Sequence, residues 1–186
     1  SFTFSNGDFR YDPGNDIAVV DAWLSLGGKS MFATGDNIIG NLSASGVNAG
    51  AFRNKWFSVA YNRDDVRPVI GGQATPIVSP ITVPGAPVLS RSYIAFGGCP
   101  GINYFNAVTA AGSAARIAEF TDPTGATGVY PYAAAIYNYV AASTTRVVFM
   151  PYDLGNIYNI GSNPGVRPVR ADILQDVLAF LGQLLG

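Results

Sequence analysis

The stretch DIAVVDAWLSLGGKSMFATGDNIIGNLSAS, residues 16–45, decides the fold that we expect for this chain. Its first ten residues place apolar side chains at helical spacing, and two glycines follow that end the helix. The run SMFAT, residues 30–34, has the length and composition of a strand. A glycine and a second helical pattern, residues 36–45, come directly after it. A strand, a tight glycine turn and a helix N-terminus predict one βα unit of a parallel sheet.

Further helices and strands are expected on the C-terminal side of this unit. Residues 48–57 can form a short helix. Residues 66–90 contain five prolines, which prevent a helix and permit only edge or irregular strands. We expect strands at 92–97, 114–120, 133–140 and 145–152, the middle two as an antiparallel pair, and a closing helix at 169–185.

Helices that alternate with short apolar strands predict a single α/β domain over residues 1–186. We expect a three-layer sandwich with a mainly parallel central sheet and a proline-rich β excursion at 66–90. The first strand that such a sheet needs is not visible before residue 16. Either FTF at residues 2–4 supplies it, or the chain is a fragment of a longer protein.

Composition excludes several classes of function. The chain has no histidine, which excludes Ser-His-Asp and Cys-His relays, two-histidine zinc sites and a histidine general base. Eleven basic and twelve acidic residues, without a basic run, argue against nucleic-acid binding. No apolar run reaches the roughly 18 residues of a transmembrane helix, so we expect no membrane span. Charged residues are 12% of the chain, against about 25% in an ordinary soluble domain.

Five segments carry a resemblance to a known family: DAWLSLGGKSMFATGDNIIGNL (21–42), FGGCPGINYF (96–105), ATGVYPYAAAIYN (126–138), VVFMPYDLGNIYN (147–159) and ILQDVLAFLG (173–182). The chain resembles the class I glutamine-amidotransferase-like, flavodoxin-like domains of large secreted bacterial proteins of uncharacterised function. The resemblance implies a flavodoxin-like fold. In working amidotransferases of this fold, a cysteine nucleophile sits on the turn after a central strand, with a His-Glu pair late in the chain. Here that turn reads Gly35-Asp36-Asn37 and the histidine is missing, so we expect the fold without the family's catalytic residues.

Four residues are candidates for ligand binding. Asp36 and Asn37 follow a strand and begin a helix, where open α/β sheets hold ligands, although capping of the helix is the favoured explanation. Asp153 is a second strand-end acid with a capping alternative. Cys99, in GGCPG, resembles a nucleophile elbow, but no base is available and Pro100 removes an N–H that an oxyanion would need. We expect a structural cysteine there.

No metal site or cofactor is predicted. The spacing of Asp8, Asp12 and Asp16 does not follow an EF-hand loop. The pair Asp64-Asp65 offers oxygen ligands, but the chain contains a single glutamate for bidentate ligation. We expect these carboxylates to be solvated turn residues.

Tyrosines are the candidates for a contact surface. Tyr130, Tyr132, Tyr137 and Tyr139 combine apolar area with a polar tip, as interface residues do, and they can stack on sugars or contact another subunit. Packing in the core is the alternative for at least half of the tyrosines. Asn41 begins a formal glycosylation sequon, Asn-Leu-Ser, which matters only outside the cell.

These observations predict a non-catalytic extracellular or cell-surface protein that assembles with itself or with neighbouring domains, as a filament, sheath or surface component. A charge-poor exterior of Tyr, Asn and Gly favours association with little charge desolvation. The alternatives are a cysteine-dependent amidotransferase-like hydrolase that uses Cys99 and a carbohydrate-binding module.

Overall fold

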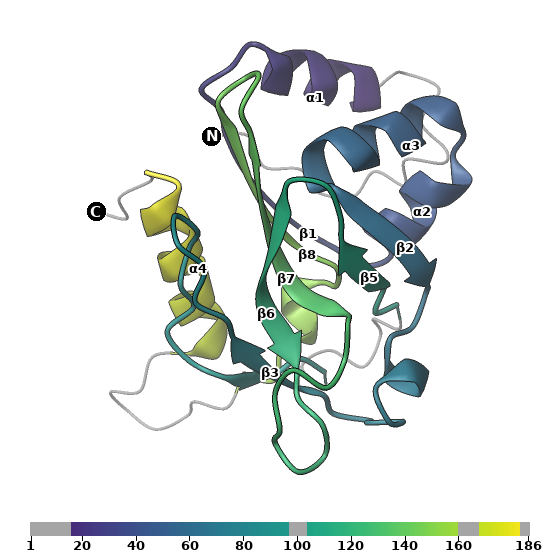
Figure 1. The fold of residues 1–186 in the computed structure, drawn as a ribbon, viewed down its shortest axis with the longest axis vertical. Coiled ribbons are helices and arrows are strands. Elements are labelled where there is room, and N and C mark those ends of the chain that lie inside the picture. Colours follow the sequence, from purple (N-terminus) through teal and green to yellow (C-terminus); the bar gives the residue numbers. More distant parts are fainter. Residues whose placement is uncertain (1–15, 97–103, 160–167, 183–186) are drawn as a thin grey trace.

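The computed structural model of the chain describes residues 16–96, 104–159 and 168–182 (Figure 1). The helices are α1 (Asp16–Ser25), α2 (Ile38–Ala44), α3 (Val47–Phe52) and α4 (Val169–Phe180), with a π-helical turn (Arg53–Phe57) after α3 and 3-10 turns at Arg67–Val69 and Leu154–Asn156. The strands are β1 (Ser30–Thr34), β2 (Val59–Arg63), β3 (Ile77–Pro80), β4 (Tyr93–Ile94), β5 (Ala107–Ala110), β6 (Ala114–Phe120), β7 (Ala133–Val140) and β8 (Thr145–Met150).

Six of these strands form one strongly curled, mixed sheet in the order β1-β8-β7-β6-β3-β4. Only the β1–β8 pair in this sheet is parallel, and its register runs without a bulge from Ser30 opposite Arg146 to Thr34 opposite Met150. The other neighbours pair antiparallel. Strands β2 and β5 form a separate antiparallel ribbon.

The expectation of a mainly parallel, flavodoxin-like sandwich was therefore wrong. The physical reason lies in the connections on the C-terminal side of the sheet. Only residues 141–144 separate β7 from β8, whereas a parallel connection needs a crossover of a dozen or more residues. The chain can only turn back on itself there, and β6, β7 and β8 become an antiparallel meander.

Several local predictions are confirmed by the structure. Helix α1, strand β1 and helix α2 form where the opening stretch predicts them. Strands β6 and β7 pair antiparallel as expected. The expectation of only edge or irregular strands within residues 66–90 was wrong for β3, which pairs with β6 on one side and, through Ile77 and Val78, with β4 on the other. Pro80 has no N–H to donate to a neighbouring strand. It lies outside the part of β3 that pairs with β4 and pairs only with β6.

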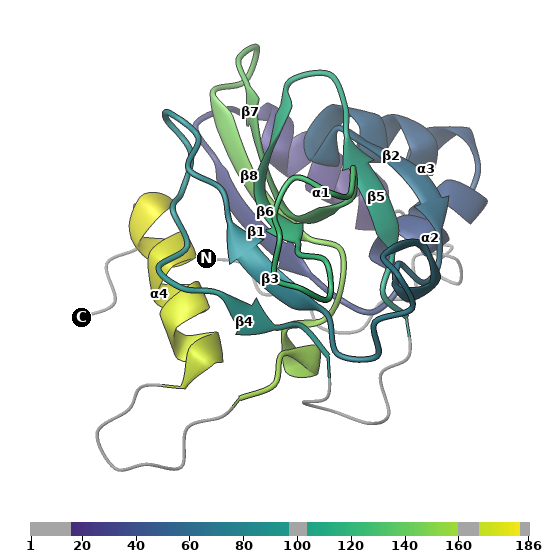
Figure 2. The same cartoon turned by 60° about the horizontal axis from the view of Figure 1, so that its bottom comes forward.

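The sheet separates two hydrophobic cores, because successive side chains of a strand point to opposite faces. On β8, Val148 and Met150 belong to one core, and Val147 and Phe149 to the other. We name them by the helices that cover them: the α4-side core and the α1–α3-side core. Figure 2 shows α4 on one side of the molecule and the three N-terminal helices on the other.

Candidate functional site

Two places gather the residues that the sequence singled out: a polar cluster where β1 and β8 end, and an aromatic pocket beside α4. The parallel pairing of β1 with β8 creates the first, because the carboxyl ends of parallel strands lie at the same edge of a sheet. We call it the strand-end cluster and define it as Asp36, Asn37, Asp64, Asn106 and Asp153.

Asp36 and Asp153 follow the two parallel strands and lie close enough for their charges to interact. Partial burial raises the pKa of Asp36, a hydrogen bond from the backbone N–H of Tyr104 lowers it, and the charge of Asp153 raises it further. The Tyr104 N–H lies 2.9 Å from Asp36 Oδ1. Asp153 itself accepts a hydrogen bond from the Gly155 N–H and caps the 3-10 turn Leu154–Asn156, as its capping alternative predicted.

Capping of α2 falls to a residue that sequence reasoning missed. Asn37 precedes the helix in the left-handed conformation, with φ 60°, and its side chain makes no capping bond. Instead Asn106 Oδ1 accepts from the N–H groups of Ile39 and Gly40 at 3.1 and 3.2 Å. Asn106 Nδ2 donates to Asn37 Oδ1 at 2.8 Å. The sequence did offer one signal for this role, since Asn106 stands between the apolar residues Phe105 and Ala107. An asparagine that is buried with such neighbours must find hydrogen-bond partners inside the protein.

The cluster is crowded around Gly40. A Cβ at this position would overlap Asn37 Oδ1 and lie 2.6 Å from Asp64 Oδ1. Asp64 Oδ1 also accepts from the Tyr61 hydroxyl at 2.8 Å. Hydrogen bonds within the chain therefore occupy both amide oxygens of the cluster and one oxygen of each carboxylate, which is the pattern of a structural network.

The other candidate acids of the sequence have structural partners or fall outside the description. Asp65 forms a salt bridge with Arg67 at 2.9 Å. Across residues 16–96, 104–159 and 168–182, no three His, Cys, Asp or Glu side chains are grouped to hold a metal ion. Cys99, Asp8 and Asp12 lie outside the described residues.

Asn156, one turn after Asp153, is fully buried and stands apart from this network. Among the described residues, neither its amide nitrogen nor its amide oxygen has a hydrogen-bond partner. An unsatisfied buried polar group costs about 1–3 kcal/mol.

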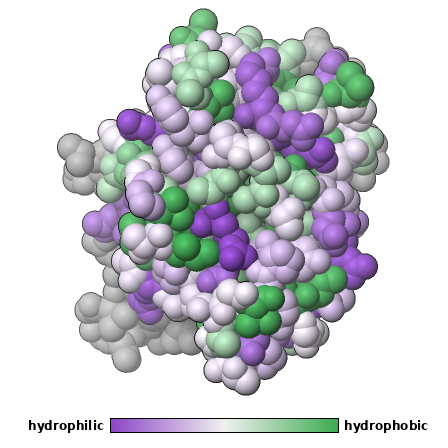
Figure 3. Space-filling model, in the orientation of Figure 1, coloured by the Kyte–Doolittle hydropathy of each residue, from purple (hydrophilic) through white to green (hydrophobic). Residues whose placement is uncertain are grey.

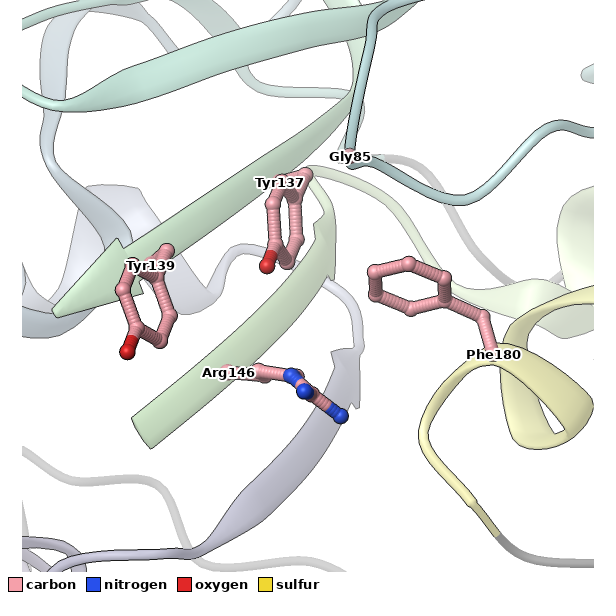
Figure 4. A pocket seen from close by; sticks show the side chains of 5 residues that line it. All are labelled: Gly85, Tyr137, Tyr139, Arg146 and Phe180. Carbon is pink, nitrogen blue, oxygen red and sulfur yellow. The ribbon is translucent and has the colours of Figure 1, made fainter. Parts of the chain in front are cut away.

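The aromatic pocket is the second place. Gly85, Tyr137, Tyr139, Arg146 and Phe180 line an open cavity of about 460 Å³ (Figure 4). Tyr137 and Tyr139 share one face of β7 because they are two residues apart. Arg146 stands opposite Tyr139 in the β7–β8 register. Phe180 comes from the last turn of α4, and Gly85 from the proline-rich segment 66–90.

The pocket walls are aromatic with one cation. The rings of Tyr137 and Phe180 meet edge to face, 5.2 Å between centroids and 89° between planes. The Arg146 guanidinium carbon lies 5.9 Å from the Phe180 ring centroid. Burial raises the pKa of Tyr137, and the positive charge of Arg146 opposes that rise. The pocket therefore presents aromatic rings together with two phenolic hydroxyls and a guanidinium.

The structure divides the four tyrosine candidates into two pairs. Tyr137 and Tyr139 line the pocket, and Tyr139 is 42% exposed. Tyr130, Tyr132 and also Tyr137 are partly buried against the α4-side core, as the packing alternative predicts for at least half of the tyrosines. The Tyr130 carbonyl accepts a bond of 2.6 Å from Arg116, which ties its loop to β6.

No family model matches this sequence, and comparisons with curated proteins and with solved structures return no significant match. None of the helices in the described ranges is long and apolar enough to cross a membrane. On the face drawn in Figure 3, strongly hydrophobic residues form several separate groups.

Proposed function

We propose that this chain is a non-catalytic interaction protein, outside the cell or on its surface, that assembles with copies of itself or with neighbouring domains as a filament, sheath or surface component. The observation that carries the proposal is the aromatic pocket, in which the exposed Tyr139 and Arg146 stand beside the partly buried Tyr137. The resemblance to amidotransferase-like domains of secreted proteins agrees with this role, since their catalytic residues are missing here.

The pocket has the residue types that dominate binding energy at protein interfaces. Tyr and Arg are enriched among hot spots, where truncation to alanine costs at least about 2 kcal/mol. Tyrosine adds a large rigid area and a hydroxyl, and it loses little conformational entropy on binding. A surface with charged residues at 12% of the chain also repels its own copies weakly.

Chemistry by a side-chain base has little support. The sequence contains no histidine. The one group with a raised acid pKa at the strand-end cluster, Asp36, is exposed and already accepts a backbone hydrogen bond. A cysteine-dependent hydrolase remains a separate proposal that rests on Cys99 alone, and a thiol reagent that fails to label the native protein would remove it.

Sedimentation equilibrium over a range of protein concentrations tests the assembly proposal. We expect the wild-type protein to associate and Tyr139→Ser to associate at least about tenfold more weakly, because a tenfold change corresponds to about 1.4 kcal/mol. Tyr158→Ser is the matched control, since Tyr158 is 45% exposed, close to the 42% of Tyr139, and does not line the pocket. A wild-type protein that stays monomeric throughout, or equal effects of the two substitutions, would contradict self-assembly through the aromatic pocket.

A carbohydrate-binding module is the second candidate. The observation that favours it is the pair of tyrosines in an open pocket beside Arg146, because flat rings stack on sugar faces and a guanidinium donates to hydroxyls. Titration with a panel of soluble glycans, followed by tyrosine fluorescence, separates the candidates. Saturable binding that Tyr139→Ser abolishes in a monomeric protein supports the module over assembly.

A further inference from the structure

The aromatic pocket carries an inference about the chemistry of its ligand, which rests on the proposal that this pocket is a binding site. The side chain that decides it is Arg146, which is exposed and lines the pocket. Its guanidinium carbon lies 5.9 Å from the Phe180 ring centroid. Within the described ranges, no oxygen forms a hydrogen bond or an ion pair with this guanidinium. Its N–H groups are therefore available to a ligand.

The other arginines in the described part of the chain show that Arg146 differs from most of them. Five have acceptors in ion pairs or hydrogen bonds: Arg53, Arg67, Arg91, Arg116 and Arg170. Within the same ranges, the guanidinium groups of Arg63 and Arg146 have no such acceptor. Arg63 does not line the pocket. Among these arginines, Arg146 alone combines a guanidinium that lacks an acceptor with a place in the pocket.

The acids of the adjoining helix are engaged elsewhere. Helix α4 contains Asp172 and Asp176. Asp176 Oδ2 accepts from the Ser90 N–H at 2.7 Å, and Asp172 pairs with Arg91 at 3.1 Å. Both contacts join α4 to the segment that also carries Gly85 of the pocket wall. They fix this wall to the helix and leave the charge of Arg146 to a ligand.

The strands place hydroxyl groups on both sides of Arg146. Ser30 of β1 and Tyr139 of β7 are its register partners, and residues directly opposite each other share a face of the sheet. Helix α4 ends at Phe180, beside Tyr137, and both Tyr139 and Arg146 are exposed. Figure 4 shows the Arg146 side chain below the two tyrosine rings, extending toward Phe180. One ligand can therefore contact the guanidinium and an aromatic ring together.

A carboxylate suits this guanidinium better than a phosphate does. The planar fork of N–H groups matches the two oxygens of a carboxylate, whose single negative charge balances the single positive one. A phosphate dianion would keep an excess charge, because no second cation lines the pocket. The aromatic walls favour a ligand with a flat ring, on which they can stack. The cavity of about 460 Å³ lies within the range of about 300–1,000 Å³ that is usual for small-molecule pockets.

We propose that the aromatic pocket binds a small carboxylate that is attached to a ring. Arg146 holds the carboxylate, and Tyr139 stacks on the ring. Two sources share this chemistry. One is the uronic acids of acidic glycans, in which a sugar ring carries the carboxylate, and the other is aromatic acids.

NMR titration of the dilute wild-type protein tests the ligand class with two pairs of probes that differ in the carboxylate. Methyl glucuronide is compared with methyl glucoside, and benzoate with benzamide. We expect at least one acid to bind at least about tenfold more tightly than its neutral counterpart, because hydrogen bonds to charged groups are the stronger ones. The acid that binds identifies the source. Equal affinities within both pairs, or no binding of either acid at millimolar concentration, overturns the proposal, as does equally tight binding of acetate or inorganic phosphate.

Arg146→Gln tests whether this side chain holds the carboxylate. The substitution removes the charge at an exposed position and keeps a polar side chain, so we expect the fold to be retained. The preferred acid should bind at least about tenfold more weakly, with the affinity for its neutral counterpart unchanged. Arg63→Gln is the matched control, since Arg63 is also exposed and lies outside the pocket. An equal loss of affinity in the two variants overturns the proposal.

The titrations and the sedimentation test of assembly can fail separately. Association that Tyr139→Ser weakens, in a protein that shows no preference for a carboxylate, overturns the ligand class and leaves assembly through the pocket standing. A preference for a carboxylate in a protein that stays monomeric supports the ligand class and contradicts assembly through the pocket.

Discussion

The hydroxyl groups of Tyr93 and Tyr152 lie 2.7 Å apart, and both side chains are buried in the α4-side core. Tyr93 belongs to β4 and Tyr152 follows β8, so this one hydrogen bond joins an outer strand to the chain beyond the parallel pair. Phe105 stacks on Tyr152 with ring centroids 4.4 Å apart. The bond thus holds together strands that the sheet order separates.

Replacing both of these tyrosines should cost less than the sum of replacing each alone. Tyr152→Phe keeps the ring and its stacking on Phe105 but leaves the buried Tyr93 hydroxyl without a partner. We expect a loss of about 1–3 kcal/mol in the free energy of unfolding, measured with urea. The double variant Tyr93→Phe/Tyr152→Phe should be closer to wild type than the sum of the single effects. Strict additivity would show that the hydroxyls do not interact.

Stability should fall at alkaline pH. Burial raises the pKa of Tyr93 and of Tyr152 above the ordinary 10.0 of a tyrosine. Burial and the neighbouring Asp64 raise the pKa of Tyr61 to about 12. Above pH 10 the unfolded chain loses phenolic protons that the folded chain retains. The three phenols therefore contribute their full stabilisation below pH 10, and the free energy of unfolding decreases as the pH rises toward their pKa values in the folded state.

Urea unfolding at several values between about pH 8 and pH 11 measures this loss. The double variant Tyr93→Phe/Tyr152→Phe should show a shallower decrease, because two of the shifted groups are gone. A wild-type protein whose stability is flat across this interval would contradict the burial of these phenols.

Gly40 and Gly50 should respond in opposite directions to alanine. In an open helical position, Gly→Ala stabilises by about 0.5–1 kcal/mol. Gly50 in α3 has open space around it and should follow this rule. At Gly40 in α2 the new methyl group would overlap Asn37 Oδ1, so Gly40→Ala should destabilise by about 1–3 kcal/mol. Thermal unfolding of both variants measures these effects. A stabilising Gly40→Ala would mean that the side chains of the strand-end cluster move aside for the new methyl group at little cost.

Asn106→Ala should be among the most damaging polar substitutions in the chain. It removes the acceptor for the N–H groups of Ile39 and Gly40 and the donor to Asn37. We expect a loss of about 3 kcal/mol in the free energy of unfolding, because several buried groups lose their partners together. Asn54→Ala is the control, since Asn54 is exposed. Similar values for the two variants would be incompatible with the capping role.

Asn138 and Asn156 offer a contrast between satisfied and unsatisfied buried amides. Asn138 accepts from the Ser113 hydroxyl and donates to the carbonyls of Lys55 and Trp56. Asn138→Ala should cost about 2–3 kcal/mol, whereas Asn156→Ala should change stability by less than about 1 kcal/mol, because no bond is lost. A large loss at Asn156, measured by the same urea titration, would reveal a partner outside the described residues or in the solvent.

Local sequence patterns predicted most elements because the physics that forms them is local. Glycines follow the end of α1, and the continuous apolar run at residues 147–150 of β8 is typical of a strand that is buried on both faces. Strand direction depends on connection lengths instead. Residues 141–144 were too few for a crossover, and this count was readable before the structure was known.

Residues of the candidate sites were predictable only where they lie on, or directly after, a single predicted strand. Asp36 and Asp153 follow strands, and Tyr137 and Tyr139 alternate along β7, so their neighbourhoods follow from position. Asn106, Gly85 and Phe180 join these places from distant segments. Sequence periodicity cannot predict contacts between segments so far apart in the chain, because these contacts depend on how the whole sheet curls.

The parallel pair also sets an order of events during synthesis. The turn that leads into β1 is bonded to residues 116 positions later, from Gly28 to Thr144, whereas β6, β7 and β8 are sequential neighbours. Loop closure over so long a span is slow compared with hairpin formation. On the ribosome, α1 and β1 emerge before β8 and must wait for it, so a chaperone would meet them with their apolar side uncovered.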